Sequence, residues 1–567
     1  MMRRLSLLLL LLALPPRSAA GQTPASDLFQ EVQRRREVAE RMWLESRDPR
    51  AFDTLQAALA SLRTRTATQL AHGLPQLASR TANTWYDVLL YRAQAGDTAA
   101  ALAALRELAA AGGGSAYLEF MRQDSTLAPL LALPDFARIA GGLRNQRRMW
   151  RDSAFVTPYR DTLPEHERIA GLSLLWAEIR YGYPDFVLSA PELNWDSLYI
   201  ATIPKVQAAQ SSFDYYRVLQ DFVARLGDSH TNAYMSSTIY QRWGARPPLA
   251  TRLIDGRVLV TDVRSSSLAA LGVRAGQEVV AVDGVPVQEY AAERVRPYVS
   301  ASTPQDADVR TYSYDLLRGW EQDSVSLTLR DARGRTDSLR LARSGYDDVA
   351  SIPMVRDSVL PGNIGYLRID TFGADTVVPL MRAAMARLAD TDGLIVDVRY
   401  NGGGSTNIGY ALLRVLAERP FPSSGQRTRY YSALSRARGS EPLFVQFPID
   451  SIRPDTIHPH YGKPVAMLIG PMTFSAAEDF AVAFDNMERG PMIGEPTGGN
   501  TGQPLFFPLP GGGAARVRTK HDLYPEGREF LFVGVQPDIL VRPRAEGIRA
   551  GRDEVLEAAL GYLRENR

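Results

Sequence analysis

Ser475 is the residue whose position is best suited to covalent chemistry. It follows an apolar run, Val465–Ile469, and a tight turn at Pro471–Phe474, and it precedes an Ala-rich segment, Ala476–Phe484, with apolar residues at helical spacing. This order predicts a buried strand, a turn and a helix. A serine at such a junction is presented by rigid elements, and the free amides at the helix start can face an anion. The same position also suits a serine that only caps the helix.

A serine nucleophile needs a base, and the chain has six histidines. His230 lies in the motif LGDSHT, where Asp, Ser and Thr can bond backbone amides and hold the turn. An unperturbed imidazole titrates near pH ~6.5 and can accept and return a proton. A lone histidine is more often structural or solvated, so the residue type alone does not establish a base. His458 and His460 flank a proline in a loop and there is no HExxH motif, so we predict no metal site.

A glycine-rich turn is the third candidate element. Asn401–Gly404 follows Leu394–Val398, a nearly continuous apolar run typical of a parallel strand covered on both faces. Glycines let the backbone approach another group closely and can point amides at an anion. A plain connection between a strand and a helix is the alternative.

The elements around these residues predict a multidomain protein. Strands alternate with helices over residues 346–545, which indicates an α/β domain with a largely parallel sheet, and a closing helix falls within 546–567. Residues 246–345 are rich in short strands and resemble a PDZ domain, a module that binds a peptide end at a sheet edge; a small β-sandwich is the alternative. Residues 151–245 are predicted to be helical.

The N-terminal part has no residues that suggest chemistry. Residues 1–20 have the arginines, apolar core and small-residue end of a secretory signal peptide, with an uncleaved anchor as the alternative. Residues 21–150 are Ala- and Leu-rich and helical in pattern. They loosely resemble a tetratricopeptide-type repeat, and an irregular helical bundle fits the pattern as well.

Composition excludes several classes of protein. The net charge is +2, so no basic surplus points to nucleic acid. There is no cysteine, which excludes disulfides, a lipid-modified cysteine and thiolate metal sites. No segment after the signal is apolar enough over sufficient length to span a membrane. We therefore expect an exported protein, periplasmic or secreted, without cofactors or an integral span after signal cleavage.

Four motifs, in this order, carry a resemblance to a known family: LGDSHT, the PDZ-like insert, DVRYNGGG, and GPMTFSAAEDF with GVQPDI behind it. Together they resemble the serine peptidases of the C-terminal processing peptidase and tricorn protease family, over roughly residues 164–541. The resemblance implies a peptidase core of the ClpP/crotonase-like α/β class. It also implies peptide or protein substrates, whose C-terminal end the PDZ-like domain would bind.

The resemblance implies roles for individual residues. One branch of the family pairs its serine with a lysine, but the matching position here is Asn500, which cannot act as a base. The other, tricorn-like branch uses a Ser-His pair and a glutamate. Ser229 and His230 match that pair. The glutamate should come from the strand of a hairpin-like stretch before GVQPDI, where Glu529 is our choice and Glu526 is the alternative.

The predicted mechanism is an acyl-enzyme on Ser475, with His230 as general base. Glu529 would orient the imidazole, Ser229 would help to orient or relay, and the amides of Ala476 and of Gly402 or Gly403 would form the oxyanion hole. Two rival interpretations stay open at this point. The same fold can serve as a non-catalytic binding protein, or the helical region and the PDZ-like domain can act as a scaffold that recruits partners.

Overall fold

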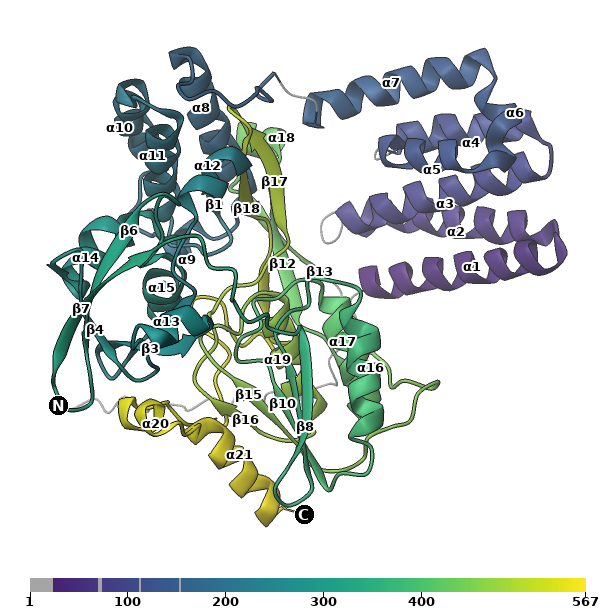
Figure 1. Ribbon diagram of the computed structural model, residues 1–567. Coiled ribbons are helices and arrows are strands. Elements are labelled where there is room, and N and C mark those ends of the chain that lie inside the picture. Colours follow the sequence, from purple (N-terminus) through teal and green to yellow (C-terminus); the bar gives the residue numbers. More distant parts are fainter. Residues whose placement is uncertain (1–23, 70–73, 112–113, 152–153, 448, 567) are drawn as a thin grey trace, which may run out of the picture. The chain divides into compact units, whose positions relative to one another are not determined.

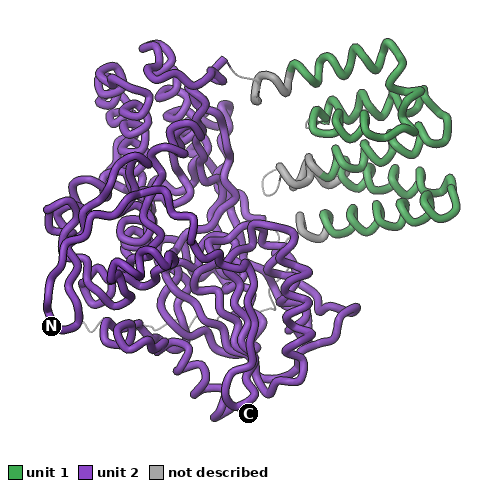
Figure 2. The backbone as a smooth tube through the Cα atoms, viewed as in Figure 1, with its two compact units in different colours: residues 1–147 green, residues 148–567 purple. Residues whose placement is uncertain are grey.

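The computed structural model describes residues 24–69, 74–111, 114–151, 154–447 and 449–566. The chain divides into two compact units, residues 1–147 and 148–567 (Figure 2). The predicted signal peptide, residues 1–20, lies outside the described residues. Within the described ranges, no helix has the length and apolar content needed to cross a membrane.

The first unit is helical, as predicted. Its elements are α1 (Pro24–Ser46), α2 (Arg50–Gln69), α3 (Leu74–Gln94), α4 (Thr98–Ala110), α5 (Leu118–Gln123), α6 (Ala128–Leu131) and α7 (Pro134–Arg151), whose C-terminal end enters the second unit. Gly96 has φ +79° and ends the turn after α3, and the Asp97 side chain accepts a hydrogen bond from Ala100 N at the start of α4. This Gly-Asp pair therefore forms the boundary between α3 and α4. The tetratricopeptide-like character stays a prediction.

The second unit begins with a helical layer. It contains α8 (Glu165–Gly182), α9 (Phe186–Ser189), α10 (Trp195–Ala208), α11 (Ser212–Ala224), β1 (Asn232–Tyr234) and α12 (Ser237–Trp243). His230 lies in the turn between α11 and β1, which Gly227 enters with φ +65°. The strand β1 pairs antiparallel with β18 (Gly513–Arg518), and β18 pairs with β17 (Pro504–Leu509). This sheet joins the histidine turn to the C-terminal part of the core.

A small antiparallel domain follows. Its strands are β2 (Leu249–Ile254), β3 (Arg257–Val263), β4 (Glu278–Val282), β5 (Val285–Pro286), β6 (Ser324–Arg330) and β7 (Thr336–Ala342), in the order β2-β3-β4-β6-β7 with β5 on β4. Its helices are α13 (Ser266–Ala270), α14 (Val287–Arg294) and α15 (Pro304–Asp308). The predicted small β domain is therefore present; its PDZ-like nature stays a prediction.

The core sheet has six strands in the order β20-β16-β15-β10-β9-β8. They are β8 (Val355–Leu360), β9 (Ile364–Ile369), β10 (Gly393–Asp397), β15 (Val465–Ile469), β16 (Met492–Gly494) and β20 (Ile539–Leu540). All neighbours are parallel except β8, which is antiparallel to β9. This confirms the predicted, largely parallel α/β domain.

Helices cover both faces of this sheet, which explains its continuous apolar strands. On one face lie α16 (Val377–Arg387), α17 (Thr406–Leu416) and α19 (Ala476–Met487), and on the other lies α21 (Glu554–Glu565) (Figure 1). Every residue of β10 and β15 is buried. Because β10 and β15 are parallel neighbours, their carboxyl ends meet at one edge, where the glycine turn and Ser475 follow them.

The C-terminal segment differs from the prediction. A three-stranded sheet joins β13 (Leu443–Phe447), β12 (Gly425–Tyr430) and β19 (His521–Leu523), with α18 (Ala433–Ala437) between β12 and β13. After β19, the sequence indicated a hairpin-like stretch with Glu529 on a strand. Residues 524–538 instead form turns, with a single bridge between Leu523 and Glu529. Left-handed backbone at Gly527 and Phe532 prevents a regular strand there.

Candidate active site

Ser475 is the last residue before α19, at the predicted junction of strand, turn and helix. Its backbone has φ +58° and ψ −128°, a conformation that non-glycine residues seldom adopt. A residue in such a conformation destabilises the folded state by about 1–3 kcal/mol, and it persists only where contacts with the surrounding structure hold it. Two backbone hydrogen bonds hold the turn: Phe474 N donates to the Asn401 carbonyl and Ser475 N donates to the Asn500 carbonyl.

The imidazole of His230 lies against the hydroxyl of Ser475. His230 Nε2 is 3.0 Å from Ser475 Oγ, which is hydrogen-bonding distance for a nucleophile and its base. The ring also stacks on Phe474, with centroids 4.7 Å apart and planes 9° apart. Two motifs separated by 245 residues therefore meet in space, and the imidazole is held on its face as well as its edge.

Asn500 is the group that orients His230. Its Oδ1 is 2.7 Å from His230 Nδ1, and its Nδ2 donates to Asp228 Oδ2 at 2.9 Å and to Ser302 Oγ. A carboxylate accepts hydrogen bonds only, so Asp228 fixes which end of the amide faces it. The Asn500 oxygen must then face the imidazole. This assigns the proton to Nδ1 and leaves Nε2 free to accept the hydroxyl proton of Ser475.

Asp228 is itself fixed by a buried arginine. Its Oδ2 lies 2.7 Å from Nε of Arg518, and both side chains are completely buried. Burial acts to raise the pKa of Asp228, but the Arg518 guanidinium and the Asn500 amide outweigh it and hold the pKa below its usual value. Asp228 is therefore a carboxylate, as the orientation of Asn500 requires.

The environment keeps the imidazole neutral. Burial, and then the positive charge of Arg516, hold the pKa of His230 well below its usual range, although Asp228 and Asn500 oppose this. A base must be unprotonated before it accepts a proton, so this shift keeps His230 competent even under mildly acidic conditions.

The amides of Gly402 and Ala476 are among the predicted donors of the oxyanion hole. Neither amide has a hydrogen-bond partner within the described part of the chain, and Gly402 lines the cleft beside Ser475. The prediction for Gly403 needs correction, because its amide donates to Asn401 Oδ1 at 2.9 Å. Gly403 has a packing role instead: with φ +95°, a Cβ there would lie 2.7 Å from the Cβ of Ser475.

The prediction for Glu529 is corrected by the geometry. Its carboxylate pairs with His521 Nε2 and, at 3.3 Å, with Arg427, and 44% of its side chain is exposed. The alternative, Glu526, pairs with Arg528. Neither glutamate contacts His230. The segment that carries them turns instead of running as a strand, so side-chain alternation does not aim either residue at the site.

Ser229 bonds its own turn and not the imidazole. Its hydroxyl contacts Asp306 and, at 3.0 Å, Ser302 Oγ, and its amide donates to Ser302 Oγ at 3.0 Å. It therefore positions the backbone that carries His230. No hydrogen bond of Ser229 reaches the His230 ring or Ser475 in the described structure.

Glu478, like Asn500, lies at the site although the sequence analysis assigned it no role. It is buried in the first turn of α19 and accepts hydrogen bonds from four donors: Ser475 N (3.2 Å), Thr497 Oγ1 (2.6 Å), Gly499 N (2.7 Å) and Asn500 N (2.9 Å). Burial raises its pKa to about 8, although these bonds act in the opposite direction. Glu478 thus fastens the Asn500 loop to the nucleophile. The spacing Ser-x-x-Glu, typical of a capping box, was the available signal.

The site opens into a cleft of about 500 Å³, a volume that suits an extended peptide segment better than a whole folded domain. Two arginines, Arg310 and Arg516, line it with Tyr314 and Phe506. Arg310 pairs with Asp306 at 2.7 Å, whereas Arg516 forms no ion pair with any described residue. Among the residues the structure describes, no group of three or more His, Asp or Glu side chains could hold a metal ion.

Several known proteins are similar to this chain. Residues 363–541 match the model of peptidase family S41, and residues 253–315 match an N-terminal domain model of S41 peptidases from Bacteroidetes. The carboxyl-terminal-processing protease of Picosynechococcus sp. is 23% identical over 320 residues, which are 55% of this chain and 68% of that protein. The chloroplastic C-terminal processing peptidase of Tetradesmus obliquus is 26% identical over 303 residues, 50% of this chain and 57% of that protein.

One solved structure shows the shared fold. Mature CPAF complexed with lactacystin aligns with 71% of this chain and 97% of its own, with a TM-score of 0.53 and 18% sequence identity. At that identity the likeness concerns the fold alone. The aligned share is larger than residues 363–541 alone, so the likeness in fold extends beyond that range.

Proposed function

We propose that this chain is a serine endopeptidase that acts through Ser475, His230 and Asn500; the match of residues 363–541 to peptidase family S41 and the ordered motifs support this proposal. The observation that carries the proposal is the chain of contacts from Ser475 Oγ to His230 Nε2 (3.0 Å) and from His230 Nδ1 to Asn500 Oδ1 (2.7 Å). A lysine base is disfavoured, because Lys520, the nearest in sequence after the serine, pairs with Asp522.

The proposed reaction begins when Ser475 Oγ attacks the carbonyl carbon of a peptide bond while His230 Nε2 accepts the hydroxyl proton. The resulting oxyanion would lie against the amides of Gly402 and Ala476; losing one such donor typically slows turnover about 10²–10³-fold. His230 then gives its proton to the leaving amine, which leaves an acyl-enzyme. Water, deprotonated by His230, would release the second product and restore the hydroxyl.

Asn500 differs from a carboxylate in this role. It fixes the tautomer and the ring orientation of His230, as the third member of a triad does, but it carries no charge to stabilise the imidazolium. Burial and the nearby charge of Arg516 favour the neutral imidazole, so the base is present over a wide pH range at some cost in basicity.

We further propose that the protein is exported and acts on peptides or unfolded proteins. The apolar segment at residues 1–20 supports export, and the small β domain at residues 246–345 supports binding of a substrate's C-terminal end at a sheet edge. Detection of the chain in a periplasmic or culture fraction, with residues 1–20 removed, would test the first part. Loss of cleavage when the substrate's terminal carboxylate is amidated would test the second.

The decisive experiment is labelling by a fluorophosphonate probe, read by mass spectrometry. We expect a covalent adduct on Ser475 of the full chain and none on Ser475→Ala or His230→Ala. Labelling that persists in His230→Ala would overturn the base assignment. A folded protein that is never labelled would instead favour the non-catalytic binding protein of the same fold.

A further inference from the structure

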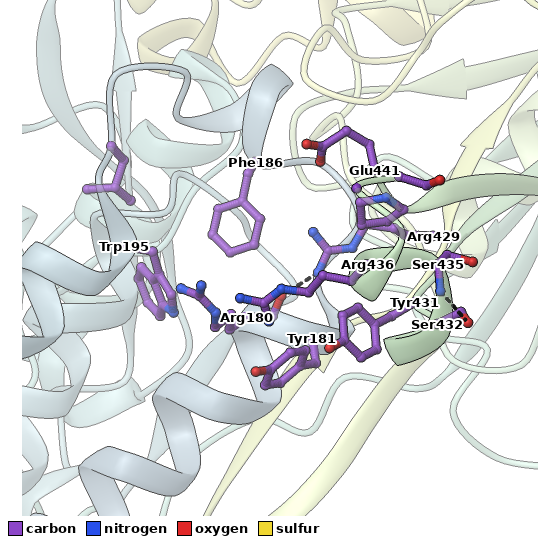
Figure 3. A pocket seen from close by; sticks show the side chains of 14 residues that line it. Arg180, Tyr181, Phe186, Trp195, Arg429, Tyr431, Ser432, Ser435, Arg436 and Glu441 are labelled. Atoms are coloured by element: carbon purple, nitrogen blue, oxygen red, sulfur yellow. Dashed lines mark hydrogen bonds between the residues drawn. The ribbon is translucent and has the colours of Figure 1, made fainter.

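A second pocket lies in the same unit, away from Ser475. It has a volume of about 440 Å³, within the range of ligand sites, and lies between the helices α8–α10 and the segment from β12 to β13 (Figure 3). Among the described residues, none that lines it also lines the catalytic cleft. The side chains that matter below are those of Arg180, Phe186, Trp195, Arg429, Tyr431 and Arg436.

The pocket carries an excess of positive charge. Three arginines line it, against one carboxylate, Glu441. Arg180 pairs with Asp196, but Arg429 and Arg436 form no ion pair in the described part of the chain. Nη2 of Arg429 donates to the carbonyl of Arg180, so its charge has no carboxylate partner among the described residues. Two guanidinium groups of this kind beside one pocket favour an anionic ligand there.

Aromatic rings surround these guanidinium groups. Arg429 lies 5.7 Å from the centroid of the Phe186 ring, and the rings of Tyr181 and Tyr431 meet edge to face at 4.9 Å. The hydroxyls of the two tyrosines contact Arg436 and raise its pKa. Figure 3 shows Arg429 and Arg436 between Phe186 on one side and the two tyrosines on the other. The planar fork of arginine suits a carboxylate, and the rings suit an apolar side chain beside it.

The rim of the pocket favours a peptide over a small molecule. Glu441 and Pro442 line the pocket, and the edge strand β13 starts at the next residue. Leu443 and Phe444, its first residues, are 59% and 51% exposed. An edge strand has unpaired backbone groups that an extended chain can bind, and exposed apolar side chains beside it add contact area.

We propose that this pocket binds an acidic peptide segment. Arg429 and Arg436 hold a carboxylate, and an apolar or aromatic neighbour of that carboxylate packs among Phe186, Trp195 and Tyr431. That the segment belongs to a protein substrate, bound away from its cleavage site, rests on the proposed function. The binding itself does not.

The test uses the full chain with Ser475→Ala, so that binding is measured without cleavage. A fluorescein-labelled peptide, Gly-Ser-Asp-Phe-Ser-Gly amide, is titrated by fluorescence anisotropy beside its Asn-for-Asp counterpart. We expect the Asp peptide to bind roughly tenfold more tightly, as a charge-assisted pair of hydrogen bonds provides. Equal binding of the two peptides would overturn the proposal. A dissociation constant for phenylacetate, measured by displacement of the peptide, that equals the peptide's own would also overturn it, because a small molecule would then bind as well as a peptide.

Variants localise the site. Arg429→Gln and Arg436→Gln should each weaken binding of the Asp peptide about tenfold, whereas Arg438→Gln, an exposed neighbour that does not line the pocket, should leave it unchanged. Arg436 is also exposed, so its substitution tests the site even if Arg429→Gln disturbs the fold. Binding that instead depends on Arg516→Gln would place the peptide in the catalytic cleft and refute the second site. An unreactive Ser475 would count against the proposed function only, because the binding test does not depend on cleavage.

Discussion

Replacing Asn500 by alanine removes the acceptor of the His230 Nδ1 proton. The bond is 2.7 Å long and both side chains are buried, so the imidazole N–H would be left without a partner. Such a loss costs about 1–3 kcal/mol. At 1.36 kcal/mol for each factor of ten, the labelling rate and kcat should fall about 5- to 150-fold. The fall should be smaller than the ~10⁴-fold loss known for a triad carboxylate, because Asn500 is neutral.

The assay is the second-order rate of fluorophosphonate labelling, followed by hydrolysis of a fluorogenic peptide. Asn500 does not line the cleft, so KM should hold while kcat falls. Asn486→Ala, on the far turn of α19, is the matched control and should react at the rate of the unaltered chain. Thermal unfolding of each variant shows whether the fold is kept.

Asn500→Asp separates orientation from charge. A carboxylate at this position would still accept the Nδ1 proton and would raise the pKa of His230, but its other oxygen would face the Asp228 carboxylate, so Asp228→Asn is combined with it to supply a donor there. In this double variant activity should persist with its acid limb at higher pH. A labelling rate for Asn500→Ala within twofold of the unaltered chain would refute the orienting role. A loss as complete as that of His230→Ala would refute the magnitude argued from a neutral group.

Three further outcomes are expected. Arg516→Leu removes a positive charge that lowers the pKa of His230, so the acid limb of the labelling rate should move to higher pH; a limb that moves down would contradict the electrostatic argument. Gly403→Ala should lower the labelling rate more than about 100-fold. Its added Cβ would lie 2.7 Å from the Cβ of Ser475 and displace the hydroxyl, and a displacement of about 1 Å lowers a rate by about this factor. Its control is Gly402→Ala, where a Cβ meets nothing within 4 Å and reactivity should survive. Glu529→Gln should change the labelling rate less than twofold, and a large loss would restore that residue to the site.

Much of the architecture could be predicted because its signals are local. The apolar run Val465–Ile469, the Gly-Pro turn and the Ala-rich segment predict β15, the turn and α19 from neighbouring residues alone. The alternation of strands and helices predicts a parallel sheet by the same kind of reasoning. The pairing of His230 with Ser475 was predicted only through the ordered motifs, since no periodicity relates residues 245 positions apart.

The third member of the site was decided by the tertiary structure. The sequence shows Asn500 only as the residue at the position that matches a lysine. Folding places its side chain between His230 and Asp228, which is 272 residues away, and this placement makes its amide oxygen an acceptor for His230. Glu529 was favoured on the assumption of a strand, and left-handed turns in that segment direct it to His521 instead.

The sequence by itself indicated most of the elements, their order and Ser475 as the candidate nucleophile, because backbone preference and hydrophobic periodicity act over a few residues. Only the tertiary structure decided which polar groups face one another. Hydrogen bonds in a buried site depend on the direction of each donor and acceptor, and direction is set by packing between distant segments. The same reason applies to the amide of Gly403, which donates to Asn401 Oδ1, and to Arg429 and Arg436 of the second pocket, which form no ion pair with any described residue.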